Sequence, residues 1–338
     1  MTERIAWVTG AGGEIGHALV PKMEGRGYRL VALDLKPLPA LSARGVTTLS
    51  FDLLDFAALD TAFEDHPPHA VFHLAALLSG KSENDPFHAH RVNVDGSVAL
   101  LERCEATARK IGRSIPFFFP SSIAAYGLPD AATKTLEGAI HEDRYDSPRR
   151  AYGCHKRYIE LFGGYLARRS AREDRPGVDF RALRYPGLIS AETTPTGGTS
   201  DFAPEMIHAA ARGENYTCWV EREARLPFMT MPDAVRATMD FMIAERVDLT
   251  RTTYNLRGFA PSAHEWSEAI RLRLPEFKVD WRPDPARQAM IDGWPADVDD
   301  LRARADWGLA PEHDLDGALD RYLLPALLAG SETAGPRK

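Results

Sequence analysis

The feature that most constrains this chain is the alternation of short apolar runs with amphipathic stretches through its first half. Each apolar run has the length of a strand and is bounded by glycine, proline or polar residues; the runs cover 4–10, 28–35, 46–53, 70–75, 115–122 and 178–187. Such runs are typical of strands buried on both faces of a parallel sheet. Several of these runs are separated by stretches whose apolar residues have helical spacing, at 14–26, 56–65 and 88–111. The sequence therefore predicts an α/β fold with a doubly wound parallel sheet.

The composition of the sequence and the length of its segments change after Pro186. Residues 190–201 are rich in Gly, Thr and Ser, and shorter helix-like and strand-like segments follow them. We predict one domain over 1–186, and a smaller α/β domain over 187–330 that binds substrate and returns some segments to the first core. The end of the chain, 331–338, is expected to be a flexible tail. The charged stretch 167–177 is expected to be a surface loop.

Charge and composition narrow the partners. A net charge of −7 argues against a general nucleic-acid surface or an anionic membrane surface. No apolar run approaches the ~18 residues of a membrane span, and the first residues lack the apolar core of a signal peptide. The three cysteines are far apart and show neither zinc spacing nor a disulfide framework. The histidines show no ligand spacing, so we expect no metal, and we expect a cytoplasmic protein.

A glycine triplet stands at the first strand-to-helix junction. In TGAGGEIG (9–16) the glycines Gly10, Gly13 and Gly16 have the spacing G-x-x-G-x-x-G. Glycines in that place let the backbone approach a pyrophosphate held at the helix N-terminus. The junction therefore predicts a dinucleotide site.

Two carboxylates end the next strands. Asp34 closes the second predicted strand, where a carboxylate accepts hydrogen bonds from the adenosine ribose and repels a 2′-phosphate. This favours NAD over NADP. Asp52 ends the third strand and is a candidate for the adenine amino group, whereas Asp55 is expected to cap the following helix.

Tyr152 and Lys156 are a candidate acid–base pair. On a helix, residues four positions apart share a face. An ammonium beside a phenol stabilises the phenolate, which lowers a pKa that starts near ~10. Oxidation of a secondary alcohol needs a base for the hydroxyl proton and an acceptor for the hydride. The pair therefore indicates the base of such a reaction.

The first half resembles the extended short-chain dehydrogenases/reductases of the NAD-dependent epimerase/dehydratase superfamily. The resemblance lies in TGAGGEIG, Asp34, HLAA (73–76), VNVDG (92–96), PSSIAAYG (120–127) and YGCHK (152–156), in that order. It implies a Rossmann-type domain with NAD, in which Tyr152 is the general base beside Ser122 and Lys156. The cofactor residues it implies are Gly10, Gly13, Glu14, Ile15, Gly16, Asp34, Asp52, Leu53, Leu74, Ala75, Ala76, Asn93, Tyr152, Lys156 and Tyr185. His73, in the same block, is expected to be structural.

Over nearly the whole chain, the sequence resembles the L-threonine 3-dehydrogenases of the short-chain type. The matching stretches are LLSGKSENDP (77–86), RYPGLIS (184–190), GGTSDFA (197–203), LPFMTMPDAVRAT (226–238) and 284–309. The resemblance implies that NAD oxidises the 3-hydroxyl of L-threonine to give 2-amino-3-oxobutanoate. It implies Ser79, Ser122, Thr199 and Trp294 as substrate residues. Arg184 and Asp233 are expected to link the domains.

Departures from that family keep other substrates open. A tyrosine is expected where Thr230 stands. Glu223-Ala224-Arg225 stands where the family often has Asp-Thr before the Leu-Pro pair. Residues 79–96 also resemble the sugar-acid dehydrogenases that act on D-erythronate and its relatives. A nucleotide-sugar epimerase or dehydratase is a third alternative, and a non-catalytic NAD sensor a fourth. The family further implies a homodimer through two helices per subunit, 88–111 and 151–169.

Overall fold

The computed structural model describes residues 4–195 and 198–333. The chain divides into two compact units. The first runs up to Ala125 and also contains Arg150–Arg184 and Thr238–Tyr254. The second contains Tyr126–Arg149, Tyr185–Ala237 and the chain from Asn255 onward.

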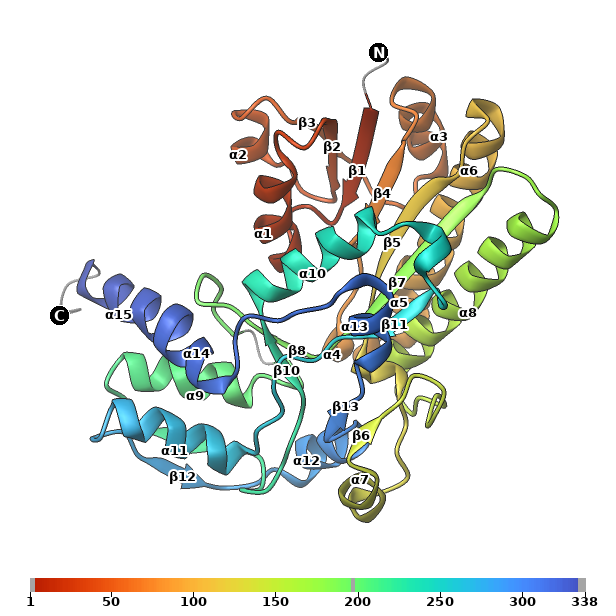
Figure 1. Cartoon of the computed structure of the whole chain (residues 1–338). Coiled ribbons are helices and arrows are strands. Elements are labelled where there is room, and N and C mark those ends of the chain that lie inside the picture. The colour runs from red at the N-terminus through yellow and green to blue at the C-terminus, as the bar shows by residue number, and fades with distance from the viewer. Residues whose placement is uncertain (1–3, 196–197, 334–338) are drawn as a thin grey trace. The chain divides into compact units, whose positions relative to one another are not determined.

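A seven-stranded sheet dominates the first unit, in the order β11-β7-β5-β4-β1-β2-β3 (Figure 1). Its strands are β1 (Arg4–Thr9), β2 (Tyr28–Asp34), β3 (Thr47–Ser50), β4 (Ala70–His73), β5 (Ile115–Ser122), β7 (Val178–Tyr185) and β11 (Thr253–Asn255). β1 pairs in parallel with β2 and β4, and the β2–β3 and β4–β5 pairs are parallel too. The predicted α/β fold on a parallel sheet is confirmed.

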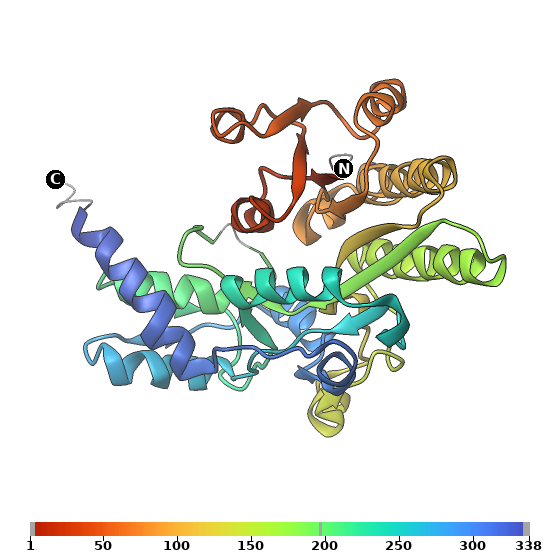
Figure 2. The same ribbon diagram turned by 45° about the horizontal axis from the view of Figure 1, so that its top comes forward.

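Three helices cover one face of this sheet (Figure 2). They are α3 (Phe56–Asp65), α6 (Gly96–Ile111) and α8 (Ala151–Arg172). Their apolar sides share one core with the strands, in which Leu59, Leu100 and Ile159 are fully buried. α1 (Glu14–Met23) lies against the opposite face. Helices on both faces explain why the strands read as continuous apolar runs.

Local signals set several helix ends. Asp55 accepts a hydrogen bond from Ala58 N at 3.0 Å, which confirms the predicted cap of α3. Gly112 ends α6 in the left-handed region at φ 68°. The predicted helix over 88–111 is built from three consecutive pieces: α5 (Pro86–His90), the π-helical turn η1 (Arg91–Asp95) and α6. The short helices α2 (Pro39–Ser42) and α4 (Ser79–Asn84) and the turn η2 (Ile123–Ala125) complete this part.

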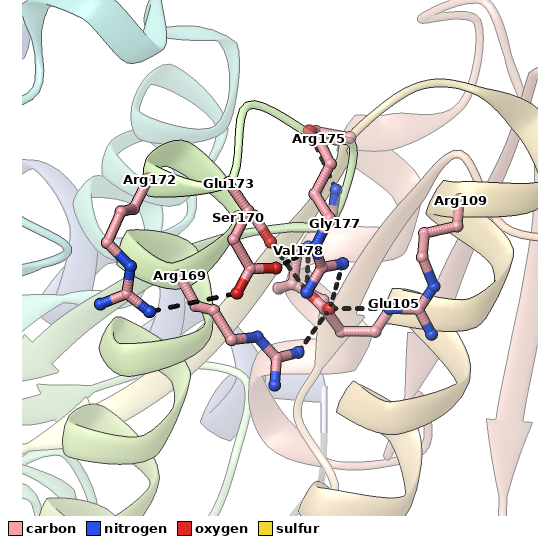
Figure 3. Close-up of polar contacts among 10 residues, drawn as sticks. Glu105, Arg109, Arg169, Ser170, Arg172, Glu173, Arg175, Gly177 and Val178 are labelled. Atoms are coloured by element: carbon pink, nitrogen blue, oxygen red, sulfur yellow. Dashed lines mark hydrogen bonds and ion pairs between the residues drawn. The ribbon is translucent and has the colours of Figure 1, made fainter.

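The stretch 167–177 differs from its prediction as a loop. α8 continues to Arg172, so half of the stretch is helical. The side chains of Arg169, Ser170 and Arg175 contact the buried carboxylate of Glu105 on α6 (Figure 3). Charge alone was a poor guide here, because an acidic partner distant in sequence holds these basic residues.

The second unit consists of short strands and helices. In chain order they are α7 (Ala131–Glu137), β6 (Ala139–Ile140), β8 (Gly187–Ile189), α9 (Phe202–Ala211), β9 (Tyr216–Cys218), β10 (Phe228–Thr230), α10 (Met231–Ile243), α11 (Ala263–Arg273), β12 (Val279–Trp281), α12 (Pro285–Asp292), β13 (Asp297–Val298), α13 (Leu301–Trp307), α14 (Leu315–Gly317), η4 (Ala318–Leu323) and α15 (Leu324–Thr333). The last residues of α10 pass into the first unit, and the turn η3 (Arg246–Asp248) follows there. β8–β10, β9–β12 and β6–β13 form parallel pairs.

Residues 126–149 belong to the second unit, although the sequence predicts a first domain over 1–186. The reason is pairing that is distant in sequence. Leu128 N donates to Gly293 O at 3.0 Å, and β6 pairs with β13. The expected tail also begins later than 331, because α15 extends to Thr333; residues 334–338 lie outside the described part.

Within the described residues, none of the helices combines the length and the apolar character that a membrane crossing requires.

Candidate active site

The passage from β1 into α1 requires glycine at two positions, one in the loop and one in the first turn of the helix. Gly10 has φ +69°, and a Cβ there would lie 2.5 Å from Ala75 N. A Cβ on Gly16 would lie 2.5 Å from Ala11 O. Gly13 is the N-cap of α1 and supplies no capping side chain. The backbone at this helix N-terminus is therefore open to close approach by an anionic group.

A cavity of about 420 Å³ lies against this loop, within the first unit. Its walls are Thr9, Gly10, Gly12, Gly13, Leu33, Asp34, Leu35, Lys36, Phe51, Asp52, Leu53, Leu74, Ala75, Ala76, Leu77, Lys81, His88 and Val92. Most of the residues predicted from the strand ends are among them. Glu14, Ile15, Gly16, Asn93, Tyr152, Lys156 and Tyr185 are not.

Asp34 is fixed at the edge of the cavity. Its Oδ2 accepts a hydrogen bond from Gly12 N at 2.9 Å, and its Oδ1 accepts one from Lys36 N at 3.3 Å. The carboxylate therefore joins the end of β2 to the glycine loop, and it lies in the cavity where the sequence predicts the ribose ligand.

The sequence did not predict three basic residues of the cavity wall: Lys36, Lys81 and His88. Lys81 lies within the LLSGKSENDP stretch, and His88 begins the predicted helix over 88–111. Cations beside a helix N-terminus favour an anionic ligand such as a diphosphate.

Ser122, Tyr152 and Lys156 all belong to the first unit, on β5 and on the first turns of α8. Lys156 Nζ donates a hydrogen bond to Pro120 O at 2.6 Å, which ties α8 to the end of β5. The same Nζ lies 5.3 Å from the centre of the Tyr152 ring. Ser122 Oγ accepts from Ala124 N at 3.1 Å.

The electrostatics of the pair differ from expectation. Burial lowers the pKa of Lys156 to about 7, although Glu160 opposes this shift. Burial also raises the pKa of the half-buried Tyr152 phenol above its usual value. The expected acidic phenol is thus not produced by Lys156 in the protein alone, because burial disfavours the charged form of both groups.

A buried ion pair fixes α8 against the sheet. Arg184 on β7 donates to both carboxylate oxygens of Glu160, at 2.8 and 2.6 Å. Ser121 Oγ donates to Glu160 at 2.5 Å. Because Glu160 follows Lys156 by one turn, these contacts also fix the position of the Lys156 turn of α8 against the sheet. Arg184 thus joins two elements of one unit, and its predicted role between domains stays a prediction.

Glu83 supplies the N-terminal cap that α8 lacks. The N-cap residue Arg150 gives no side-chain hydrogen bond, but Glu83 Oε1 accepts from Ala151 N at 2.7 Å. Glu83 Oε2 also lies 3.5 Å from Arg150 Nη1. A carboxylate at a helix N-terminus is favourable, so α4 anchors the start of α8.

His73 is structural, as predicted. Its Nδ1 lies 2.7 Å from Thr9 Oγ1, and its Nε2 lies 2.8 Å from Ser97 Oγ. Ser97 donates to Asn93 O, so it accepts from Nε2–H and Thr9 donates to Nδ1. Burial lowers the pKa of His73 to about 3, and the neutral ring joins β1, β4 and α6.

The predicted substrate residues are divided between the units. Ser79 begins α4 in the first unit, whereas Thr199 and Trp294 are buried in the second. Asp233, also in the second unit, accepts hydrogen bonds from the backbone of Glu312 and His313 at 3.0 and 3.1 Å. The substrate roles therefore stay predictions.

Across the described ranges, no group of three or more His, Cys, Asp or Glu residues could hold a metal ion.

Comparison with known proteins places the chain in a family. Residues 6–256 match the NAD dependent epimerase/dehydratase family. An uncharacterized epimerase/dehydratase of Staphylococcus saprophyticus is 34% identical over 331 residues, covering 97% of this chain and 98% of that protein. The mitochondrial L-threonine 3-dehydrogenase of Bos taurus is 32% identical over 311 residues, covering 91% of this chain and 78% of that protein.

A solved structure agrees along the whole chain. The monomeric L-threonine 3-dehydrogenase from a metagenome shares 31% identity and a TM-score of 0.81, covering 98% of this chain and 100% of that one. The glycine loop, the fixed Asp34 and the cavity between them fit the dinucleotide that the family uses. The chain therefore belongs to the NAD dependent epimerase/dehydratase family and is an NAD-dependent oxidoreductase.

Proposed function

We propose that this enzyme oxidises the secondary alcohol of a small hydroxylated acid with NAD, and that the substrate is L-threonine, converted to 2-amino-3-oxobutanoate. The observation that carries the proposal is similarity to L-threonine 3-dehydrogenases over at least 91% of the chain. It extends through the second unit, where the predicted substrate residues Thr199 and Trp294 lie.

Ser122, Tyr152 and Lys156 of the first unit act together on the substrate hydroxyl. Tyr152 takes the proton of the substrate hydroxyl as general base. Ser122 donates a hydrogen bond to the substrate oxygen while the carbonyl develops. A bound NAD would supply the acceptor for the hydride that leaves the carbinol carbon.

Lys156 supplies the positive charge beside the base. Because burial lowers its pKa to about 7, a part of the lysine is neutral at neutral pH. An anionic neighbour favours the ammonium form. The phenolate of Tyr152 and the charged Lys156 therefore stabilise each other, and each offsets the burial cost of the other.

The substrate side of the proposal assigns Ser79, Ser122 and Thr199 to the polar groups of the acid, and Trp294 to the apolar side of the pocket. Thr230 replaces a tyrosine expected from the resemblance. Its hydroxyl lies 3.2 Å from His313 Nδ1 and is fully buried, so it belongs to the packing of the second unit.

A screen of purified enzyme for NADH formation tests the substrate. L-threonine, other hydroxy-amino acids, aldonates such as D-erythronate, and nucleotide sugars are supplied with NAD. We expect the highest kcat/KM with L-threonine. Turnover confined to aldonates would transfer the assignment to a sugar-acid dehydrogenase, and turnover confined to nucleotide sugars would reject the hydroxy-acid class.

The variant Tyr152→Phe tests the base. We expect it to lower kcat by about 10²- to 10⁴-fold, because the proton acceptor is lost while NAD affinity changes little. Tyr158→Phe is the matched control, since Tyr158 is exposed on the same helix. Equal turnover of Tyr152→Phe and wild type would remove Tyr152 from the chemistry.

We also propose a cytoplasmic location and a homodimer. Cys104, Cys154 and Cys218 form no disulfide, which supports a reducing compartment.

A further inference from the structure

The catalytic helix carries a buried histidine that the proposed chemistry does not use. His155 lies on α8 directly before Lys156 and is only 6% exposed. Its Nδ1 is 3.4 Å from the amide nitrogen Nδ2 of Asn93 on η1. Asn93 is itself only 4% exposed. The two side chains therefore meet in a place where an unmatched polar group is costly.

The amide of Asn93 has one possible orientation. Its Oδ1 accepts from Leu77 N at 2.7 Å, and its Nδ2 donates to Leu77 O at 2.9 Å. The second hydrogen on Nδ2 is left for His155, so Nδ1 of His155 must accept and the ring hydrogen must be on Nε2. Leu77 is part of the wall of the dinucleotide cavity.

We propose that neutral His155 is a positioning residue for NAD binding, which acts by holding the Asn93 amide and, through it, the Leu77 wall of the cavity. The chain of contacts runs from α8 through η1 to the segment after β4. It couples the catalytic helix to the cofactor site without a direct contact between His155 and the cofactor. The proposal rests on NAD as the cofactor.

The surroundings of His155 keep the ring neutral near pH 7. Burial lowers its pKa most, and His90 and Lys156 lower it further when they carry their positive charges, whereas Glu83 raises it. The His90 ring stands edge-on to His155, with their centres 5.5 Å apart. Acid protonates Nδ1, which then presents a hydrogen to the hydrogen of Asn93 Nδ2. The contact is lost, and we expect weaker NAD binding at low pH.

The dissociation constant of NAD, measured without substrate at about pH 8 and about pH 5.5, tests this device. His155→Gln offers an acceptor that does not titrate. We expect acid to weaken NAD binding about tenfold more in wild type than in His155→Gln, the loss of one buried hydrogen-bonded contact. His155→Leu removes the acceptor, so its affinity should be low at both pH values.

Two further variants sharpen the test. His90→Gln removes a neighbouring charge, so the acid loss of affinity should begin at a higher pH than in wild type. His264→Gln, in the second unit beside Arg222, should behave as wild type. Thermal unfolding at both pH values identifies a variant that fails to fold. If His155→Leu does not fold, the acid loss of NAD affinity in wild type and in His155→Gln still tests the proposal.

Two results overturn the proposal: the same acid loss in His155→Gln as in wild type, or unchanged affinity in His155→Leu. These results differ from a failure of the cofactor assignment, in which wild type would bind no NAD at any pH.

Discussion

Asp34 shows how one side chain shapes both the glycine loop and the choice of cofactor. Its carboxylate accepts from Gly12 N and faces the cavity, with Lys36 in the same wall. The negative charge repels a 2′-phosphate, while Lys36 would attract one. The preference for NAD therefore depends on the charge of Asp34 outweighing that of Lys36.

Asp34→Asn separates charge from structure, because the amide oxygen can still accept from Gly12 N. We expect the ratio of kcat/KM for NAD to that for NADP to fall by about tenfold or more, as a repulsive charge is removed beside a lysine. Asp52→Asn is the control, since Asp52 also lines the cavity and its carboxylate accepts a local hydrogen bond from Leu54 N. An unchanged ratio in Asp34→Asn, or an equal change in both variants, would contradict this account.

At the residue scale, the sequence predicted the parts of the site that depend on local backbone. Gly10 and Asp34 sit at a strand-to-helix junction and a strand end, so their neighbours along the chain reveal them. Lys36, Lys81 and His88 reach the cavity only through the tertiary fold. The raised pKa of Tyr152 could not be predicted either, because burial depends on all the segments that pack around the side chain in the fold.

Among the elements, Glu105 holds two helices and a strand together (Figure 3). Its Oε2 accepts from Arg109 on α6 at 3.2 Å and from Arg169 on α8 at 2.9 Å. Its Oε1 accepts from Val178 N, at the start of β7, at 2.9 Å. Burial acts to raise the pKa of Glu105, but the bonds from Val178 and Arg169 outweigh it and hold the pKa below the usual value.

Glu105→Gln leaves the surrounding arginines without their buried counter-charge. We expect a loss of about 3–5 kcal/mol in the free energy of unfolding near pH 7, measured with urea. Because the folded-state pKa is lowered, the carboxylate stabilises above its unfolded pKa and stops doing so in acid. The gap between wild type and variant should therefore close as pH falls below about 4.

Glu102→Gln provides the matched control, because Glu102 is 80% exposed on the same helix and should change stability by less than about 0.5 kcal/mol. Equal stabilities of wild type and Glu105→Gln near neutral pH would show that Glu105 holds nothing together.

At the element scale, most of the large sheet could be predicted because its strands are long apolar runs between breakers. The end of α8 could not, since the charged residues 167–172 find their partner on α6. The grouping of residues 126–149 with the second unit could not be predicted for the same reason: β6 is only two residues long and is defined by its pairing with β13.

For the whole molecule, the exposed apolar surface of α8 indicates a partner for the first unit. An apolar stripe lies on α8, where Tyr158, Leu161 and Tyr165 are 46%, 53% and 43% exposed. Phe162 stacks with both tyrosines, with ring centres 5.9 and 6.3 Å apart. Positions three, four and seven apart fall on one helix face, and such a face is typical of helix–helix contact. The stripe supports the proposed homodimer through α6 and α8.

Leu161→Asp tests the homodimer, because a carboxylate in the middle of the stripe cannot be buried against a second copy without a large cost. Light scattering of wild type should give twice the 37.4 kDa of one chain, and Leu161→Asp should give one chain. Leu272→Asp is the control, since Leu272 is 80% exposed on α11 in the second unit and should leave the dimer intact. A wild-type particle of one chain would reject the dimer, and an intact dimer of Leu161→Asp would move the interface away from α8.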